Sequence, residues 1–469
     1  MMPDPIGYAA AALSIPLLLI LAALGCLILP LFFKQLRGTQ GLIALGAVLV
    51  CLTFFRRAPA AELSMFSGAL LLSPITAYLW VLALAVLALV VVLSIARPAA
   101  PEESGGEYYF LLFMATIGLM VLVAAGDLFT VFIALELLSL PVYALAGIRR
   151  SKPGIEAAYK YFMLGAFGSG MTVMGIAVLN AIYPELTFTA LRVGAPGPLA
   201  LAGFILVISG FAFKTALVPF HMWVPDAYEG APTQVSAFMA AAVKTAGVVV
   251  LWRLFSLFNG GPVREVFWWL AAVTVVAANL MALAQKGLKR LLAYSSIAHA
   301  GYIAVAFFGG RQGFEAVLYY LPVYAMATTG AFSVALLLEK NEKGPLIEDL
   351  AGLAKSRPWL AGAMAAFMFS LAGVPPLAGF FAKFYAFAGA VDAGYTRLVV
   401  IAIIMSAVSI YYYLKVTVVM YMKPAAAEPS YDAPGMIEAV IFLMAAGVIL
   451  AGVFSRPLLA MAAEASKWF

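Results

Sequence analysis

Five lysines lie within long apolar stretches of the sequence, where a positive charge is costly. They are Lys160, Lys214, Lys244, Lys383 and Lys415. If these stretches cross a bilayer, each lysine at membrane depth costs roughly 2.5–3.5 kcal/mol even on a lenient insertion scale. Such side chains must face the protein interior, pair, lose their protons or extend to the interface. Extension to the interface suits Lys415, which follows three tyrosines toward the end of its stretch.

Glu136 is the one acidic residue, of 22, that lies in the middle of such a stretch. At about 6–7 Å and an effective dielectric constant near 20, a carboxylate attracts an ammonium by about 2.5 kcal/mol. That energy is enough to decide whether a buried lysine keeps its proton. A carboxylate and several lysines inside one protein can therefore act as a proton switch.

Two of the lysines lie beside residues that break helices. Pro219 lacks an amide hydrogen and clashes with the carbonyl of Thr215, so the helix should break beside Lys214. The stretch 373–379 holds two prolines and two glycines and precedes Lys383. Discontinuous helices at corresponding positions in two halves of a chain are typical of ion sites in transporters.

The sequence has two histidines and two cysteines. His221 follows the first predicted break, and His299 lies further along the chain. An imidazole titrates near pH 6.5 and can relay protons, although a structural hydrogen bond is an equally good interpretation. Cys26 and Cys51 lie in separate apolar stretches and cannot by themselves hold an iron–sulfur cluster or a zinc ion. We expect no metal and no cofactor in this chain.

The composition requires a membrane as the setting for these residues. Of the 469 residues, 65% are apolar and 11% are charged, whereas a soluble domain has about 25% charged residues. A water-soluble enzyme is therefore excluded. Long apolar runs without alternation predict an all-α, polytopic membrane helical bundle rather than a barrel. We predict fourteen transmembrane helices, over residues 7–33, 40–56, 74–97, 109–125, 127–149, 154–183, 198–226, 232–258, 264–285, 289–309, 314–340, 357–390, 394–422 and 434–456.

The order of the spans suggests an internal repeat. The two interrupted spans are five apart, and five is odd, so a second unit would cross the membrane in the inverted orientation. We predict an N-terminal three-helix segment over 1–108, inverted five-helix repeats over 109–258 and 259–422, and a C-terminal helix within 423–469. Each repeat would hold one half-channel and one discontinuous helix.

The positive charges predict an orientation. The net charge is +6, but the basic residues are scattered and form no patch for nucleic acid. With the N-terminus outside, fourteen lysines and arginines fall on inner connections, Lys289 among them. Nine fall on the outer side, including Arg56, Arg57 and Arg253. This bias predicts that both termini lie on the outer side.

Four stretches carry a family resemblance, namely Leu135–Pro141, Phe213–Pro232, Leu288–Tyr302 and Gly373–Tyr385. They resemble the subunit N family of respiratory complex I, and the similarity extends over nearly the whole chain. That family belongs to a wider group of antiporter-like subunits, which includes subunits L and M and the large Mrp subunits. The resemblance implies redox-driven proton translocation across an energy-coupling membrane, here a bacterial inner membrane.

The resemblance also implies roles for particular residues. Six residues would carry protons: the glutamate Glu136, its partner Lys214, the linking lysine Lys244, the terminal lysine Lys383, Lys160 near the inner side, and His299 on the central axis.

The same resemblance implies partners and leaves alternatives open. The partners would be the lipid bilayer and other membrane-arm subunits, of the K, J and M types. NADH, FMN, iron–sulfur clusters and quinone would lie in partner subunits, so the chain would be enzymatic only as part of an NADH:quinone oxidoreductase. Subunit M carries glutamate where Lys383 stands. An Mrp-type sodium/proton antiporter subunit can also carry lysine there and remains an alternative, as does a membrane subunit of an energy-converting hydrogenase. A passive scaffold would not need broken helices beside buried lysines.

Overall fold

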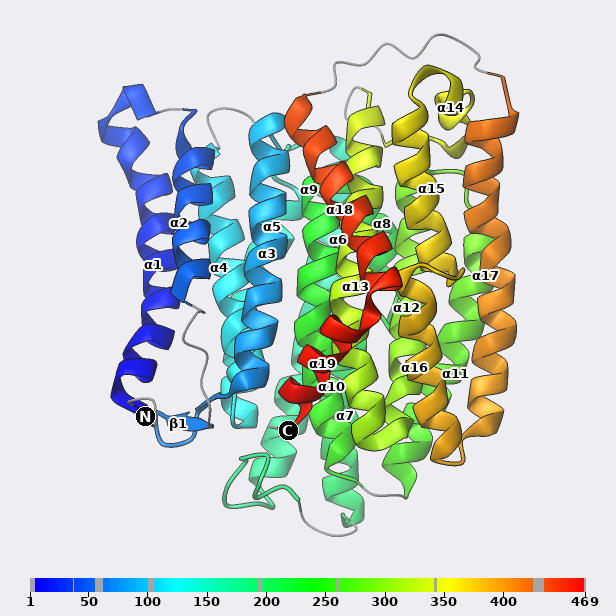
Figure 1. Ribbon diagram of the computed structural model, residues 1–469. Helices are drawn as coiled ribbons and strands as arrows, with labels where there is room; N and C mark the ends of the chain where they lie inside the picture. The colour runs from blue at the N-terminus through cyan, green and yellow to red at the C-terminus, as the bar shows by residue number, and fades with distance from the viewer. Residues whose placement is uncertain are drawn as a thin grey trace.

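Helices make up nearly all of the regular structure in the computed structural model. It describes residues 5–36, 38–54, 62–99, 105–192, 196–258, 261–340, 344–424 and 434–467. The helices lie side by side, with α1 (Pro5–Phe32) and α2 (Gln40–Phe54) at one edge and α17 (Thr396–Met422) at the opposite edge (Figure 1). The predicted all-α membrane bundle is confirmed.

Most predicted spans correspond to one helix each, and a few are divided. The remaining helices before the middle of the chain are η1 (Lys34–Leu36), α3 (Pro74–Ala96), α4 (Gly105–Ala124), α5 (Leu128–Ala146), α6 (Lys152–Asn180), α7 (Pro198–Thr215), α8 (Trp223–Gly230), α9 (Thr233–Phe238), η4 (Met239–Val243) and α10 (Lys244–Ser256). Those that follow are α11 (Pro262–Leu283), α12 (Leu288–Ala306), η5 (Phe307–Gly309), α13 (Gly310–Leu338), η6 (Ile347–Leu350), α14 (Leu353–Ser356), α15 (Pro358–Ala372), α16 (Ala378–Asp392), α18 (Gly435–Val453) and α19 (Ser455–Ser466). Within the described residues, eleven helical stretches are long and apolar enough to cross a membrane. The count of fourteen crossings stays a prediction.

Both predicted helix breaks are confirmed. Helix α7 ends at Thr215 and α8 begins at Trp223, so the interruption lies directly after Lys214. Helix α15 ends at Ala372 and α16 begins at Ala378, shortly before Lys383. Pro219, Gly373, Pro375 and Pro376 lie in the two connecting segments, and Gly379 lies in the first turn of α16.

The first half of each broken helix ends in the same way. Ala216, with φ +65°, and Gly373, with φ +85°, are in the left-handed conformation. The next amide in each case, of Leu217 or Val374, donates back to a carbonyl five residues earlier, at 2.8 and 2.9 Å. This is the Schellman ending, which normally uses glycine because a Cβ is unfavourable there.

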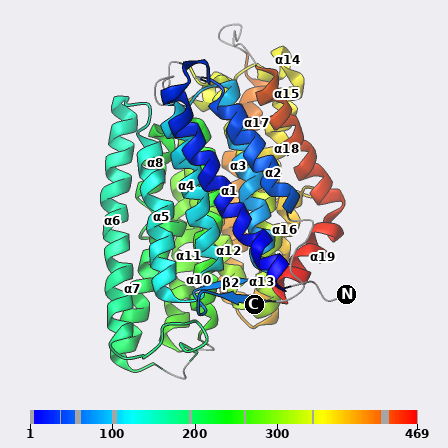
Figure 2. The same cartoon turned by 90° about the vertical axis from the view of Figure 1, so that its left-hand side faces the viewer.

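Figure 2 shows α6 on the rim of the bundle, whereas α10 lies inside it. The span that contains Lys244 combines α9, the π-helical turn η4 and α10, and its side chains are buried. The π turn ends directly before Lys244. Such turns occur frequently at functional sites in helices.

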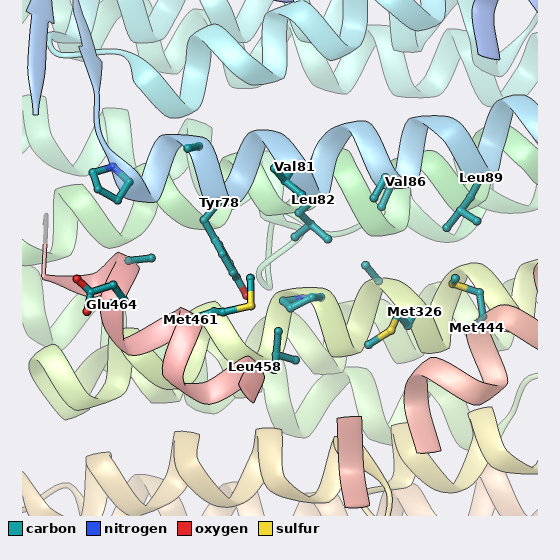
Figure 3. A pocket seen from close by; sticks show the side chains of 16 residues that line it. Tyr78, Val81, Leu82, Val86, Leu89, Met326, Met444, Leu458, Met461 and Glu464 are labelled. Carbon is teal, nitrogen blue, oxygen red and sulfur yellow. The ribbon is translucent and has the colours of Figure 1, made fainter. Parts of the chain in front are cut away.

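Two elements lie outside the predicted spans. Strands β1 (Leu63–Met65) and β2 (Leu70–Leu72) form an antiparallel hairpin. Helix α19 packs on α3 and α13 after the last predicted span. Its residues Leu458, Met461 and Glu464 help to line a mostly apolar cavity of about 550 Å³ between α3, α13 and α18 (Figure 3).

Two basic residues of the charge count are buried in the bundle. Lys289, which the sequence places in an inner connection, lies in α12, and Arg253, which it places on the outer side, lies in α10. Lys289 donates to the carbonyl of Ala231 at 2.7 Å, and Arg253 donates to the carbonyl of Ala125. Each cation donates to an acceptor on another segment, and the distribution of charges along the sequence gives no signal of such a contact.

The orientation in the membrane stays a prediction. Arg56 and Arg57 lie outside the described residues. Helix α1 begins and α19 ends at the same end of the bundle (Figure 1). The first and the last described helix therefore begin and end on one side, which the charge bias predicts to be the outer side.

The two helix endings predict opposite effects of exchanging alanine and glycine. Ala216→Gly should stabilise the protein by about 1 kcal/mol, because a left-handed alanine is strained. Gly373→Ala should destabilise it, since the new Cβ would be strained and would lie 3.0 Å from Cδ of Lys383. Thermal unfolding midpoints of the purified protein test this. Equal shifts in the two variants would contradict the assigned backbone conformations.

Candidate functional site

Three of the five predicted lysines are buried in the interior of the bundle. Lys214, Lys244 and Lys383 are 2%, 3% and 5% exposed. Each lies beside an irregularity of the backbone: the end of α7, the π turn η4, or the break before α16. Irregular backbone at membrane depth is tolerated where protein or a hydrated cavity surrounds it.

Lys214 is held against helix α5 and an aromatic cluster. Its Nζ donates to Oγ of Ser139 at 2.8 Å. The same atom lies 5.9 Å from the ring centroid of Tyr143 and 5.8 Å from that of Tyr161. A cation at this distance from an aromatic face is attracted by the ring quadrupole.

Glu136 lies one turn before Ser139 on α5 and is half-buried. Its carboxylate accepts a hydrogen bond from Oγ of Ser169 on α6. Across the described part of the chain, no direct ion pair joins Glu136 to Lys214. The hydroxyl of Ser139 contacts the amine instead, so the carboxylate acts on Lys214 through space rather than by contact.

Lys244 is bonded to helix α12. Its Nζ donates to the carbonyl oxygen of Ser296 at 2.6 Å and also to the Oγ of that residue. One turn further along α10, a Cβ added to Gly247 would lie 2.9 Å from Cγ2 of Thr215 and 3.4 Å from Cγ of Lys214. The helices that carry Lys214 and Lys244 are therefore in direct contact.

Helix α12 continues the polar path beyond Lys244. His299 and Tyr302 follow Ser296 at three-residue intervals, so the three side chains share one face of the helix. His299 Nδ1 lies 2.6 Å from the hydroxyl of Tyr320, and its Nε2 lies 3.2 Å from that of Tyr413. The imidazole is thus hydrogen-bonded on both sides.

Lys383 lies at the far end of this path. Its Nζ donates to the carbonyl of Ala372 at 2.9 Å and to Oγ of Ser406 at 3.0 Å, and it lies 4.7 Å from the ring centroid of Tyr302. Ala372 is the last residue of α15, so the helix break frees the carbonyl that receives the amine. We call Glu136, Lys214, Lys244, His299 and Lys383, with their hydroxyl partners, the buried polar row.

The structure does not bring every candidate into the buried polar row. The Lys160 side chain is 43% exposed and pairs with Asp226 at 2.9 Å. Lys415 is half-buried, lies about two turns before the end of α17, and donates to the carbonyl of Gln285 at 3.3 Å. His221 is buried in the segment between α7 and α8.

The hydroxyl partners were not singled out from the sequence. They are Ser139, Ser169, Ser296, Tyr320, Ser406 and Tyr413. Helical spacing could have found two of them, because Ser139 is three residues after Glu136 and Ser296 is three residues before His299. Ser169 and Ser406 lie on other helices and have no such signal.

The groups of the buried polar row are chemically able to exchange protons. Amines and an imidazole each take up or release one proton, and a hydroxyl both donates and accepts hydrogen bonds. In the described ranges, no group of three or more metal-ligating His, Cys, Asp or Glu side chains occurs. Cys26 and Cys51 are buried as small side chains on separate helices.

Comparisons with known proteins match most of the chain. The family model described as "NADH:quinone oxidoreductase/Mrp antiporter, TM" matches residues 125–409, which contain the buried polar row. An NADH-quinone oxidoreductase subunit N from Trichlorobacter lovleyi is 40% identical over 417 residues, which cover 86% of each chain.

Two solved structures have the same fold over nearly the whole chain. A chain of respiratory complex I from Thermus thermophilus, solved with bound aureothin, is 34% identical, with a TM-score of 0.84 over 96% of this chain and 99% of that one. A chain of the membrane-bound sulfane sulfur reductase, an archaeal respiratory membrane complex, is 25% identical, with a TM-score of 0.88 over 98% and 99%.

The close approach of α10 to Lys214 predicts a position-specific packing effect. Gly247→Ala should lower the free energy of unfolding by about 1–3 kcal/mol, because the added methyl overpacks the contact with Thr215. Gly170→Ala on α6 is the matched control: nothing lies within 4 Å of the added Cβ, and we expect a gain of about 0.5–1 kcal/mol, because alanine favours a helix over glycine. Thermal unfolding of the purified variants measures both. A destabilised Gly170 variant beside an unaffected Gly247 variant would refute this packing.

Proposed function

The chain belongs to the family of NADH:quinone oxidoreductase and Mrp antiporter membrane subunits, and we propose that it is a proton-translocating subunit N in the membrane arm of an NADH-quinone oxidoreductase. The observation that carries this proposal is the buried polar row, in which three buried lysines and a histidine follow one another through the bundle. Its setting is a bacterial inner membrane, with both termini on the outer side.

In the proposed mechanism, Lys214 receives a proton from the inner side while the charge of Glu136 stabilises its ammonium. Movement of a neighbouring subunit weakens that attraction, and Lys214 releases the proton toward Lys244. The hydrogen bonds of Ser296 and His299 on α12 continue the path. Lys383 receives the proton at the break between α15 and α16 and releases it to the outer side.

The energy for this transfer comes from partner subunits. In this proposal they hold NADH, FMN, the iron–sulfur clusters and quinone, and this chain contributes the membrane path. Its direct neighbours are membrane-arm subunits of the K, J and M types. The segments 109–258 and 259–422 act as the inner and outer half-channels, and Lys244 with Ser296 joins them, since these two residues lie on opposite sides of that division.

Removing either member of the Glu136–Lys214 pair should stop pumping without stopping electron transfer. We expect Lys214→Ala and Glu136→Ala to lower proton uptake by inside-out membrane vesicles about tenfold or more, because a positioned acid–base group is lost. NADH oxidation by ferricyanide, which needs only peripheral subunits, should stay unchanged. The measurement is the proton-to-electron ratio during NADH oxidation.

Lys415→Ala is the matched control, since this lysine lies in a span but outside the buried polar row. It should leave the ratio unchanged. A normal ratio in the Lys214 or Glu136 variant would refute the assigned roles. Sodium-dependent proton exchange without NADH oxidation would instead indicate an Mrp-type antiporter subunit.

Lys160 should contribute less than the buried lysines. We propose that it gathers protons at the inner side, where its ion pair with Asp226 is partly exposed. An exposed ion pair contributes little, because water screens its charges, so Lys160→Ala should lower the proton-to-electron ratio far less than Lys214→Ala. The proton-to-electron ratio of the same vesicles tests this. A loss as large as that of Lys214→Ala would place Lys160 in the transfer path itself.

A further inference from the structure

A buried carboxylate outside the buried polar row joins several helix ends. Glu339 follows the last residue of α13 and is 4% exposed. One oxygen accepts from Nη1 of Arg149 at 2.5 Å, and the other accepts from Oγ1 of Thr233. Burial alone would raise the pKa of Glu339, but Lys289 and Arg149 together hold it below its usual value. The group is therefore an anion in the folded protein.

The surrounding groups are tied together by further hydrogen bonds. Nη2 of Arg97 donates to the backbone carbonyl of Glu339 at 2.7 Å, and Nε2 of Gln234 donates to the carbonyl of Arg97 at 2.5 Å. Lys289 donates to the carbonyl of Ala231 at 2.7 Å. We call this set, centred on Glu339, the inner clasp; it joins α3, α9, α12, α13 and the connection after α5.

The inner clasp holds the same two helices that bring Lys244 to Ser296. Thr233 begins the span that carries Lys244 and lies about three turns before it. Lys289 lies two turns before Ser296 on α12. The π turn between Thr233 and Lys244 departs from regular helical register. A span that contains such a turn needs a fixed end if its later residues are to keep their positions.

We propose that Glu339 is a positioning residue, whose carboxylate holds Thr233 and Arg149 so that Lys244 stays at Ser296. This inference rests on the proposed function, because the Lys244–Ser296 contact is the step between the two half-channels. The contact is short, at 2.6 Å, and a displacement of about 1 Å can slow such a step about 100-fold. Glu339 itself touches none of the proton-carrying lysines of the row.

The sharpest test removes a single hydroxyl. Thr233→Val deletes the donor to Glu339 at nearly constant volume and leaves the Arg149 pair in place, whereas Thr233→Ser keeps a hydroxyl. In the whole complex, we expect the valine variant to lower the proton-to-electron ratio at least about threefold, and the serine variant to restore it. Glu339→Gln should lower the ratio about tenfold, because it removes the charge. Glu348→Gln, an exposed carboxylate on η6, is the control and should have no effect.

The amount of assembled complex separates positioning from simple structural support. Normal assembly with a lowered ratio in Thr233→Val supports the proposal. An unchanged ratio in that variant, or reduced assembly with an unchanged ratio in Glu339→Gln, overturns it. Lys244→Ala separates failure of the proposed function from failure of the positioning role of Glu339. If this variant pumps normally, the proposed function fails. If it stops pumping while Thr233→Val pumps normally, only the positioning role fails.

Discussion

The bonds from buried lysine amines to hydroxyls and carbonyls are the interaction on which this bundle depends. A lysine inside an apolar bundle needs acceptors, and neither Lys244 nor Lys383 has a carboxylate partner at contact distance within the described residues. Ser296 and Ser406 supply hydroxyls, and the end of α15 supplies a carbonyl. Without these acceptors, each amine would carry the full cost of an unsatisfied buried polar group.

The irregular backbone follows from that requirement. An unbroken helix uses its own carbonyls, whereas a helix end leaves them free for other donors. The break after Ala372 leaves such a carbonyl free to accept a hydrogen bond from Lys383. In the inner clasp, the side chain of Arg97 donates in the same way to the carbonyl of Glu339, just after the end of α13. The interruptions are therefore part of the polar interior, in keeping with the rule that irregular backbone at membrane depth must be surrounded by protein.

The local features of this fold were predictable, and the long-range ones were not. Prolines and glycines located both breaks, and the position of Lys214, Lys244 and Lys383 in apolar runs predicted their burial. The partners of these lysines lie on other helices, so no spacing in the sequence revealed Ser406. For the same reason, the sequence does not reveal that Lys289 is buried and donates to the carbonyl of Ala231. Helix α19 is short and mixes polar with apolar residues, so it has no hydropathy signal of its own.

The hydroxyls beside the amines have a consequence for direction. A serine or tyrosine hydroxyl rotates, so one bond can reverse its sense without any heavy atom moving. A proton path that is joined by such hydroxyls is symmetric, because protons can pass along it equally well toward either face of the membrane. Vectorial flow must therefore come from timing imposed at its two ends. Detached from those controls, the same polypeptide would let a proton gradient run down and could not build one.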